Sequence, residues 1–421
     1  MRNGKDGQYQ HRPDSNFWYL TGFKGFRSEE SVLVVTNDTP PRSIFFTPDV
    51  NTPVMLAFCG PVCGVNRTKT EYGFDEAYPS EEIEKKLPEI LSGYDTLFYP
   101  MFRDETWDKK IFSWTSSARG QNPRKWKPPC STISDLSVHL GEMRLIKDPD
   151  EIKLLRWVAR ITAEGVHSAL LELSKNRNTG FFEYETQSDV EEYFVKHGCK
   201  NSFPSIIASG KNACTLHYED NNSPLLKGDL VLLDVGAEKY CYAGDVSRTF
   251  PVSGKFTPAQ RKLYDIVLRA QESAIDKMRV GIPYNIPHFA SVKVIVEGLI
   301  SLGLLKGTVE EEMAKGTDPS LPFSESYRRF YMHSVGHWLG LDAHDDCPYF
   351  NEDGTPRTFL PGMVMTSEPG LYIKNDADIP VEYRNIGIRI EDDILITEDG
   401  PEILSAGCPK DPDEIEKIMS F

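Results

Sequence analysis

The sequence predicts a two-domain protein in which an α/β amino-terminal domain precedes an α+β carboxy-terminal domain. At 421 residues the chain is long enough for two hydrophobic cores. Strand-like and helix-like runs alternate through the first third of the chain, which is typical of an α/β unit. A long amphipathic helix, an apolar hairpin and further helices and strands follow. We therefore expect domains at residues 1–142 and 143–421, with the boundary close to Met143.

In the amino-terminal domain, apolar runs bounded by turn residues predict the strands. These runs are SVLVVTND (31–38), SIFFTPD (43–49) and DTLFYP (95–100). The segment EEIEKKLPEILSG (81–93) is an amphipathic helix with a glycine at its end. Pro, Lys and Arg concentrate between Arg119 and Pro129, which predicts a surface loop near the domain edge.

The carboxy-terminal domain begins with a strong helix-start signal. Asp148 is a suitable N-cap, Pro149 takes the first helical position and Glu151 completes a capping box. An apolar stripe at helical spacing follows: Ile152, Leu155, Ala159, Thr162, Val166 and Leu170. We expect further helices near 184–197, from a capping box at Thr257 towards Met278, and at 286–302. Strands are expected at 205–209, 362–369 and 385–397, and a loop at 306–322.

The composition argues against several classes of partner. A formal net charge of −16 and a pI near 5.1 disfavour nucleic acid and anionic membranes. No run approaches the roughly 18 apolar residues of a membrane span, and residues 1–15 lack a signal-peptide core. Cys59 and Cys63 form the one close pair among eight cysteines, so we expect free thiols rather than a zinc ribbon. Free thiols predict a reducing compartment, the cytoplasm, with the mitochondrion as the alternative.

The segment from Leu230 to Phe250 carries the first candidate site. Its two apolar runs predict a hairpin, with Gly236, Glu238 and Lys239 in the turn. A turn centred between Lys239 and Tyr240 would place Asp234 directly opposite Asp245. Opposed carboxylates repel one another, and their burial is costly unless a cation compensates. The pair therefore predicts metal ligation; the alternative is that two Asp residues merely flank a polar loop.

Further candidate ligands lie nearer the carboxy terminus. Glu368 ends an apolar strand where Pro369 and Gly370 force a turn. Glu391 shares one strand face with Arg389, although the two could form only a surface ion pair. The segment HSVGHWLGLDAHD (333–345) contains His333, His337 and His344.

The spacing of His333 and His337 is that of a helical zinc-protease motif. Ser334, however, stands where that motif needs its catalytic glutamate. Gly336 and Gly340 are also unfavourable in a regular helix, so we exclude the motif. A single histidine among apolar residues is more often a core residue than a ligand, but three histidines beside acidic residues favour a site.

Together these positions supply four carboxylates and one imidazole: Asp234, Asp245, His337, Glu368 and Glu391. Such an oxygen-rich set suits Mn, Co or Zn. Four carboxylates around one divalent ion would leave excess negative charge, which two ions with bridging carboxylates would balance. Two ions about 3.5–4 Å apart can hold a hydroxide between them and stabilise a tetrahedral intermediate. The pattern therefore predicts metal-assisted hydrolysis.

Five separated motifs resemble one family in order along almost the whole chain. They are DSNFWYLTGF (14–23), NACTLHYEDN (212–221), LLDVGAEKYCYAGDVSRTFPVSGKFT (232–257), MHSVGHWLGLDAHD (332–345) and SEPGLYI with NIGIRIEDDILIT (367–373, 385–397). They resemble aminopeptidase P, the Xaa-Pro aminopeptidases of the pita-bread metallopeptidase fold. The resemblance implies a creatinase-like amino-terminal domain and a pita-bread catalytic domain. It also implies hydrolysis of the amino-terminal Xaa-Pro bond through a metal-bridging hydroxide.

The resemblance implies a role for each matching residue. Asp234 would bind one Mn2+, His337 and Glu368 the other, and Asp245 and Glu391 both, with Zn2+ or Co2+ as alternative metals. Glu368 would also act as the base. The remaining matches imply that His217 and His344 contact substrate and stabilise the intermediate, and that His333, Tyr372 and Arg389 line the proline pocket.

The resemblance leaves alternatives for activity and assembly. Prolidase, which cleaves Xaa-Pro dipeptides, is the alternative enzyme, and a non-enzymatic peptide-binding protein is disfavoured because all five ligand positions hold competent side chains. The expected partners are peptides with proline second and further copies of the chain, in a dimer or tetramer. Relatives carry a helix and a strand ahead of the segment that begins here at Asp14, so we expect the amino-terminal domain to lack an edge.

Overall fold

The computed structural model describes residues 12–24, 30–121, 128–176 and 180–420. The chain divides into two compact units, Met1–Gly141 and Glu142–Phe421. Both units combine helices with strands and contain separate hydrophobic clusters. The mixed two-domain class predicted from the sequence is thereby confirmed. The prediction that the amino-terminal domain lacks an edge concerns the start of the chain. Residues 1–11 lie outside the described part, so this stays a prediction.

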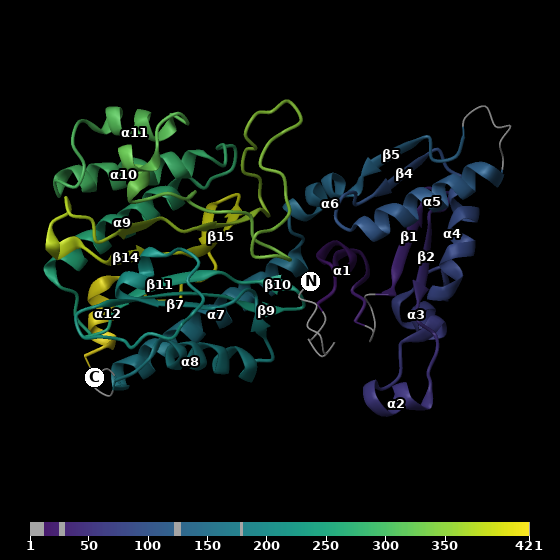
Figure 1. Cartoon of the computed structure of the whole chain (residues 1–421), viewed down its shortest axis with the longest axis horizontal. Helices are drawn as coiled ribbons and strands as arrows, with labels where there is room; N and C mark the ends of the chain where they lie inside the picture. The colour runs from purple at the N-terminus through teal and green to yellow at the C-terminus, as the bar shows by residue number, and fades with distance from the viewer. Residues whose placement is uncertain (1–11, 25–29, 122–127, 177–179, 421) are drawn as a thin grey trace. The chain divides into compact units, whose positions relative to one another are not determined.

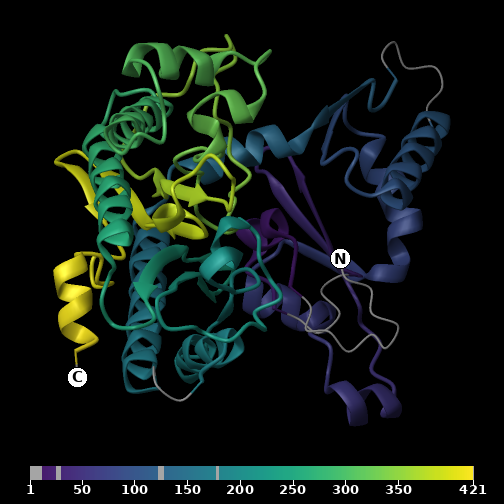
Figure 2. The same cartoon turned by 60° about the vertical axis from the view of Figure 1, so that its left-hand side comes forward.

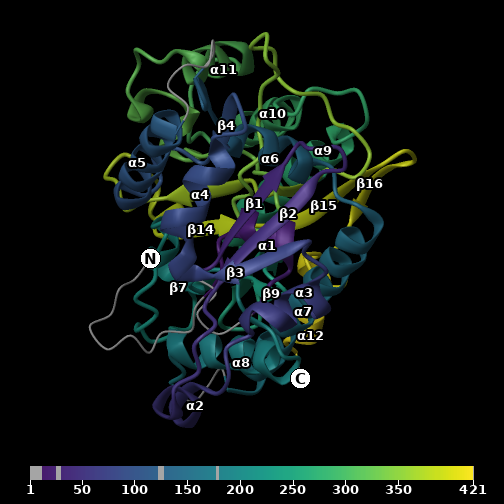
Figure 3. The ribbon, with the colours of Figure 1, turned by 90° about the vertical axis from the view of Figure 1, so that its right-hand side faces the viewer.

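The amino-terminal unit contains two small sheets, and Figure 3 shows β1, β2 and β3 side by side. The strands are β1 (Val32–Thr36), β2 (Arg42–Thr47), β3 (Glu76–Pro79), β4 (Thr96–Tyr99) and β5 (Thr132–Asp135). The helices are α1 (Ser15–Thr21), α2 (Pro53–Cys59), α3 (Gly64–Tyr72), η2 (Ser80–Glu82), α4 (Ile83–Leu91) and α5 (Glu105–Gln121), and α6 (Leu136–Leu145) runs across the boundary at Gly141. β1 is antiparallel to β2, whereas β2–β3 and β4–β5 are parallel pairs.

Most elements predicted for this unit are present. The strands expected at 31–38, 43–49 and 95–100 are β1, β2 and β4, and the amphipathic helix is α4. Its apolar face packs with α5 and the first sheet, where Leu87, Trp114 and Phe46 are buried. The predicted surface loop begins later than expected because α5 continues to Gln121, and residues 122–127 lie outside the described part.

The carboxy-terminal unit is built from short strands between long helices. Its helices are α7 (Pro149–Asn176), α8 (Glu183–Lys196), η3 (Gly210–Cys214), α9 (Pro258–Lys277), α10 (Ile286–Ser301), α11 (Val309–Thr317), η4 (Phe323–Glu325), η5 (Tyr327–Arg329), η6 (Val381–Tyr383) and α12 (Pro412–Ile418). Its strands before α9 are β6 (Lys200–Asn201), β7 (Ile206–Ser209), β8 (Leu230–Val235), β9 (Ala237–Lys239), β10 (Tyr242–Ala243) and β11 (Val246–Pro251). Its later strands are β12 (Val364–Ser367), β13 (Gly370–Ile373), β14 (Ile386–Arg389), β15 (Asp392–Thr397) and β16 (Gly400–Ile403).

The helix starts follow the capping signals in the sequence. Asp148 Oδ1 accepts hydrogen bonds from the N–H groups of Asp150 and Glu151, and Glu151 Oε2 accepts one from the N–H of Asp148. Thr257 and Gln260 form the second predicted capping box at the start of α9. These side chains satisfy N–H groups that have no partner within the helix. The apolar stripe of α7 is buried apart from Ile152, which is half-buried.

The helices enclose the strands in layers. In Figure 1, α9 and α10 lie on one side of the strands of this unit, and α7 and α8 lie on the other. The view turned by 60° in Figure 2 keeps α9 and α10 side by side. A buried cluster containing Val166, Leu233, Val267 and Ile388 joins α7, β8, α9 and β14. In the described parts of the chain, no helix is both long and apolar enough to cross a membrane.

The central hairpin is present, but its predicted register is wrong. Asp234 pairs with Ser247, not with Asp245. The turn lies at Tyr240 and Cys241, which have φ of 51° and 65°, and residues 237–239, placed in the turn, belong to β9. Two left-handed residues at a hairpin tip are characteristic of a type I′ turn. The positions of Gly236 and Lys239 in the sequence do not indicate this turn. The partner of Asp234 moves by two residues, so the two Asp side chains stay on one face.

Two other predictions are corrected. The segment 306–322 is not only loop, because α11 occupies Val309–Thr317 behind a capping box of Thr308 and Glu311. The run 385–397 is two strands, β14 and β15, which pair with different partners. The break falls at Ile390 and Glu391. At that break the chain leaves the two-stranded sheet of β13 and joins the sheet of β12.

Candidate metal centre and active site

The central hairpin positions two of the expected carboxylates. Asp234 is the fifth residue of β8, and Asp245 immediately precedes β11. A Cβ at Gly236 would lie 1.9 Å from the carbonyl oxygen of Gly244, so only glycine permits the close approach of the two strands beside the carboxylates. Asp245 is 5% exposed, and its N–H donates to Asp393 Oδ2 at 3.2 Å.

Backbone hydrogen bonds between the segments 335–337 and 366–368 position His337 and Glu368. The N–H of Thr366 donates to the carbonyl oxygen of His337, and the N–H of Glu368 donates to that of Val335. His337 Nε2 lies 3.6 Å from Glu368 Oε1 and 3.5 Å from Asp245 Oδ2. The segment 333–345 thus adds an imidazole to the hairpin carboxylates, without the helix of a zinc-protease motif.

Glu391 and Arg389 come from the break between β14 and β15. The N–H of Glu391 donates to the carbonyl oxygen of Ser247 at 3.0 Å, which joins this segment to β11. Arg389 Nη2 donates to Asp234 Oδ2 at 2.6 Å and its Nε donates to Ser247 Oγ at 2.9 Å. The two side chains share a face as predicted, while Ile388 and Ile390 enter the hydrophobic cluster on the other.

The structure brings four of the five expected ligand side chains close together and links the fifth, Asp234, to them through Arg389 and Ser247. Asp245, His337 and Glu391 each offer a ligand atom within 4.8 Å of the others. Glu368 lies against His337, and Asp234 raises the pKa of Asp245, Glu368 and Glu391 after the larger effect of burial. Residues from β8 to β15, far apart in the sequence, thus form one acidic cluster.

Electrostatic repulsion and burial both act on this cluster. Burial, Asp234, Asp393 and Glu368 raise the pKa of Asp245 well above its usual range. Burial raises the pKa of Glu391 in the same way, with Asp245 and Glu368 adding to the effect. Charged carboxylates at these distances need a compensating charge. Arg389 supplies one positive charge, which is fewer than the four carboxylates require.

The donor set fits divalent cations. Asp234 Oδ1 is buried and has no hydrogen-bond partner among the described residues. His337 Nδ1 lies 3.1 Å from the carbonyl oxygen of Trp338, so we assign the ring proton to Nδ1. Nε2 then presents a lone pair towards Asp245 and Glu368. One imidazole and several carboxylates, with a buried carboxylate oxygen of Asp234 beside them, are the donors that a hard or borderline metal ion needs.

The expected proline-pocket residues form one hydrogen-bonded chain. Arg389 Nη1 donates to Tyr372 Oη at 2.9 Å, and the Tyr372 hydroxyl lies 2.9 Å from His333 Nε2. His333 Nδ1 lies 2.8 Å from the carbonyl oxygen of Ser334, so Nδ1 donates there and Nε2 accepts from Tyr372. Burial raises the pKa of Tyr372 to about 12 and lowers that of His333 to about 3. Tyr372 and His333 are therefore both uncharged at neutral pH, and Arg389 carries the charge of this hydrogen-bonded series.

The other two histidines, His344 and His217, both have exposed side chains. His344 stacks on His337 with ring centroids 4.0 Å apart. Partial desolvation of the ring, followed by His337 and His217, lowers the pKa of His344 to about 4, so its imidazole is neutral at pH 7. His217 is exposed, on the segment that follows η3, and it also lowers the pKa of His333 after burial and Arg389. His217 therefore interacts electrostatically with both His344 and His333.

Three functional neighbours were not anticipated from the sequence. Ser247 Oγ accepts from Arg389 and donates to Glu391 Oε2 at 2.7 Å. Asp393 binds the backbone of Asp245, and the buried Arg248 donates to the carbonyl oxygens of Ser247 and Glu391. The alternation of β11 could have indicated Ser247, because it lies two residues from Asp245. No sequence signal links Arg248 to residues more than 140 positions away.

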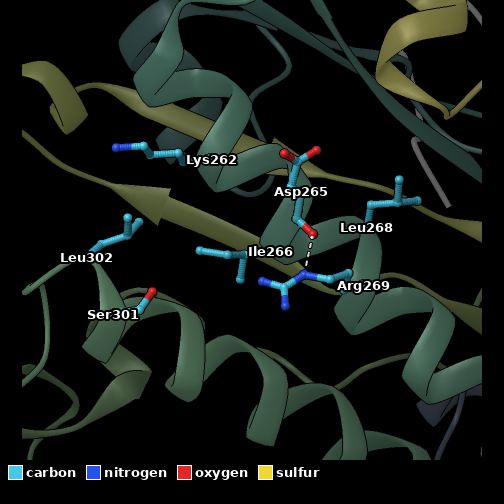
Figure 4. Close-up of a pocket in the computed structure, with 7 residues that line it drawn as sticks. All are labelled: Lys262, Asp265, Ile266, Leu268, Arg269, Ser301 and Leu302. Carbon is cyan, nitrogen blue, oxygen red and sulfur yellow. Dashed lines mark hydrogen bonds between the residues drawn. The ribbon is translucent and has the colours of Figure 1, made fainter.

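A separate groove of about 660 Å³ lies between α9 and α10. Figure 4 shows its lining, in which Arg269 Nε donates to the backbone carbonyl of Asp265. Its other lining residues are Lys262, Ile266, Leu268, Ser301 and Leu302. None of these is a member of the acidic cluster, so the groove is not the chemical centre.

Comparison with known protein families agrees with this geometry. The model of metallopeptidase family M24 matches residues 153–398, a range that contains every member of the acidic cluster. The chain belongs to metallopeptidase family M24. The model of the aminopeptidase P amino-terminal domain matches residues 1–99 of this M24 chain. The predicted combination of an aminopeptidase P amino-terminal domain with a pita-bread domain is confirmed.

Xaa-Pro aminopeptidases are similar to this chain over nearly its full length. The Xaa-Pro aminopeptidase of Haemophilus influenzae is 40% identical over 100% of this chain and 91% of its own length. That of Escherichia coli is 39% identical over 98% of this chain and 90% of its own length. Zn-substituted E. coli aminopeptidase P in complex with product has a TM-score of 0.90 at 39% identity, covering 100% of this chain and 91% of that chain.

Proposed function

We propose that this chain is a metal-dependent aminopeptidase that hydrolyses the bond between an amino-terminal residue and a following proline. The single observation that carries the proposal is the buried cluster of Asp245, His337 and Glu391, with Asp234 and Glu368 beside it. Full-length similarity to Xaa-Pro aminopeptidases supports the choice of substrate. Proline removes the amide N–H and restricts φ, so such a bond requires a dedicated cleft.

We propose two divalent ions, most favourably Mn2+, with Zn2+ and Co2+ as alternatives. Asp234 would hold one ion, His337 and Glu368 the other, and Asp245 and Glu391 both. When bound, such a pair lowers the pKa of water and stabilises negative charge that develops on a carbonyl oxygen. Support comes from the number of carboxylates, which one ion and Arg389 together would not neutralise. Metal analysis of the purified protein should give about two ions per chain.

The protein side chains then move protons and hold the substrate. Glu368, whose pKa burial raises, is suited to take a proton from the attacking water and pass it to the proline nitrogen. His344 is neutral, so it can donate one N–H towards the carbonyl oxygen. His217 would approach the substrate from the exposed side. Tyr372 and His333 would line the pocket for the proline ring.

Arg389 has a positioning role in this scheme. Its three donor nitrogens bind Asp234, Ser247 and Tyr372, so it links the carboxylate cluster to the proline pocket. A bidentate or forked guanidinium contact is geometrically rigid. We infer that Arg389 fixes the distance between the reacting carbonyl and the proline subsite.

A peptide panel tests the substrate class. The purified protein, loaded with Mn2+, should release the first residue from Xaa-Pro tripeptides and longer peptides. The matched control peptide carries alanine in place of proline and should be cleaved poorly. Hydrolysis restricted to Xaa-Pro dipeptides would replace the proposal with a prolidase. No release from any of these peptides by metal-loaded protein would contradict it.

We further propose that the chain forms a dimer or tetramer in the cytoplasm. Val54, Leu56 and Phe58 expose 65%, 47% and 85% of their surface on the short helix α2, which supports self-association. Six cysteines have free thiols, which fits a reducing compartment: Cys63, Cys130, Cys199, Cys214, Cys347 and Cys408. Light scattering coupled to size-exclusion chromatography tests the assembly; a monomer at micromolar concentration would contradict it.

A further inference from the structure

Glu183 is a fully buried carboxylate with an unusual set of partners. It is the first residue of α8 and is 0% exposed. Its Oε1 accepts hydrogen bonds from the N–H of Ser209, the hydroxyl of Ser209 and Nδ2 of Asn212, at 2.7, 2.8 and 3.0 Å. Its Oε2 accepts from Tyr218 Oη and the N–H of Ser223, both at 2.8 Å. Every one of these donors belongs to residues 209–223.

The segment 209–223 carries His217, which the proposed function uses. Beyond η3 it contains no helix or strand, so its own backbone does little to fix its position. Asn221 adds a second attachment, accepting from the N–H of Ile207 and donating to the carbonyl oxygen of Ser205. Glu183 binds both ends of the segment, and one of its partners, Tyr218, is the residue next to His217.

The charge of Glu183 suits this role better than a neutral side chain. A carboxylate offers only acceptors, and here donors face both of its oxygens. Hydrogen bonds to a charged acceptor are stronger and shorter than neutral ones. The amino terminus of the 14-residue helix α8 also favours negative charge at this position. A glutamine of the same shape would direct its NH2 group at the donors that face one of the two oxygens.

We infer that Glu183 is a positioning residue that holds His217 against the substrate carbonyl. This inference rests on the proposed function, because His217 acts only if a peptide is bound beside the acidic cluster. Glu183 itself touches none of the expected ligands in the described hydrogen-bond network; its effect passes through Tyr218 and the backbone of the segment. Loss of its charge should therefore displace His217 and leave metal binding unchanged.

The test is a double-mutant cycle on the full-length, metal-loaded enzyme. Glu183→Gln should lower kcat/KM by about 10- to 100-fold, since a misplacement of about 1 Å costs ~10²-fold. His217→Ala should give a similar loss, and the double variant should be no worse than His217→Ala alone. Metal content should equal that of the wild type. Losses that multiply in the double variant, or wild-type activity in Glu183→Gln, would overturn the inference.

Hydrogen exchange separates this inference from the proposed function. Glu183→Gln should speed amide exchange in peptides spanning 209–223 and nowhere in β12 or β15, whether or not any substrate is cleaved. Glu312→Gln is the matched control, because Glu312 is 2% exposed and bonded to Lys315 within α11. If Glu183→Gln does not fold, Tyr218→Phe in a cycle with His217→Ala supplies the same comparison. Unchanged exchange at 209–223 would contradict the positioning role.

Discussion

Arg389 donates a hydrogen bond of 2.6 Å to Asp234, and the two residues lie 155 positions apart in the chain. The contact joins β14 to β8 at the edge of the acidic cluster. It gives Asp234 Oδ2 a fixed partner and leaves Oδ1 free among the described residues to face the centre. Strand β8 determines only on which face of the sheet Asp234 lies. The salt bridge to Arg389 then fixes the orientation of its carboxylate.

Removal of Asp245 should impair metal binding and cause a large loss of activity. Asp245→Ala deletes the carboxylate that faces His337 and would contact both ions. We expect bound metal to fall by at least about one ion per chain and activity to fall by about 10³-fold or more. Elemental analysis and a peptide assay measure the two effects. Asp265→Ala, on α9 away from the cluster, is the control, and retained activity in Asp245→Ala would exclude a bridging role.

Loss of the Ser247 hydroxyl should impair catalysis without unfolding the protein. Ser247→Ala removes the group that accepts from Arg389 and donates to Glu391. The unpaired partners should cost about 1–3 kcal/mol of stability, and kcat/KM should fall about 10- to 100-fold. Urea unfolding and steady-state kinetics measure these effects. Ser253→Ala, at an exposed site beyond the same strand, should match the wild type; equal behaviour of both variants would exclude the bridge.

Chelation should destabilise the carboxy-terminal unit. Metal ions held by the acidic cluster would stabilise the folded state by offsetting repulsion between buried carboxylates, so their removal should lower the free energy of unfolding. At a free ion concentration of about 100 Kd the loss is about 2.7 kcal/mol. Calorimetry before and after dialysis against EDTA should show a lower Tm that Mn2+ restores. An unchanged Tm together with unchanged activity would contradict a resident metal.

Replacement of Asp189 by asparagine should stabilise the protein in a pH-dependent way. Burial raises its pKa from 3.8 to about 6, with Glu172, Glu192 and Glu185 adding to the shift and Lys175 opposing it. The folded state therefore holds this proton more tightly than the unfolded state, and stability falls as pH rises from about 4 to 6. Asp189→Asn should stabilise the protein at pH 7.5 by about 1–2 kcal/mol, allowing for partial exposure.

The gain in the free energy of unfolding from Asp189→Asn should be smaller at pH 5, because Asp189 of the wild type is already protonated in part of the population. Urea unfolding at the two pH values measures it. An equal gain at both would assign the effect to packing rather than to ionisation.

Substitution of Tyr240 at the hairpin tip by residues that tolerate a left-handed backbone should stabilise the protein. Tyr240 has φ of 51° and is 52% exposed, so its side chain contributes little burial to offset the backbone cost. Tyr240→Asn and Tyr240→Gly should raise the free energy of unfolding by about 0.5–1 kcal/mol. Tyr240→Ala provides the control and should gain less. The reverse order, with alanine most stable, would contradict the type I′ assignment.

Local signals in the sequence were sufficient for much of the fold. Asp148 with Glu151 and Thr257 with Gln260 start helices as their spacing predicts, because an N-cap and its N3 partner interact within a single turn. The apolar run at Leu230–Leu233 became a buried strand. In the segment 306–322 the acidic residues suit a loop as well as a helix, and only Thr308 and Glu311 indicate α11.

The sequence by itself determined which side chains could serve the chemistry. Charge, spacing and motif order singled out Asp234, Asp245, His337, Glu368 and Glu391, since isolated acids next to apolar strands are costly unless they bind something. Tertiary structure alone decided how they meet. The turn at Tyr240 and Cys241 set the register, and the break at Glu391 moved one strand between two sheets. The networks of Ser247 and Glu183 join residues too distant in the chain for any local pattern to encode, because such contacts depend on packing between elements.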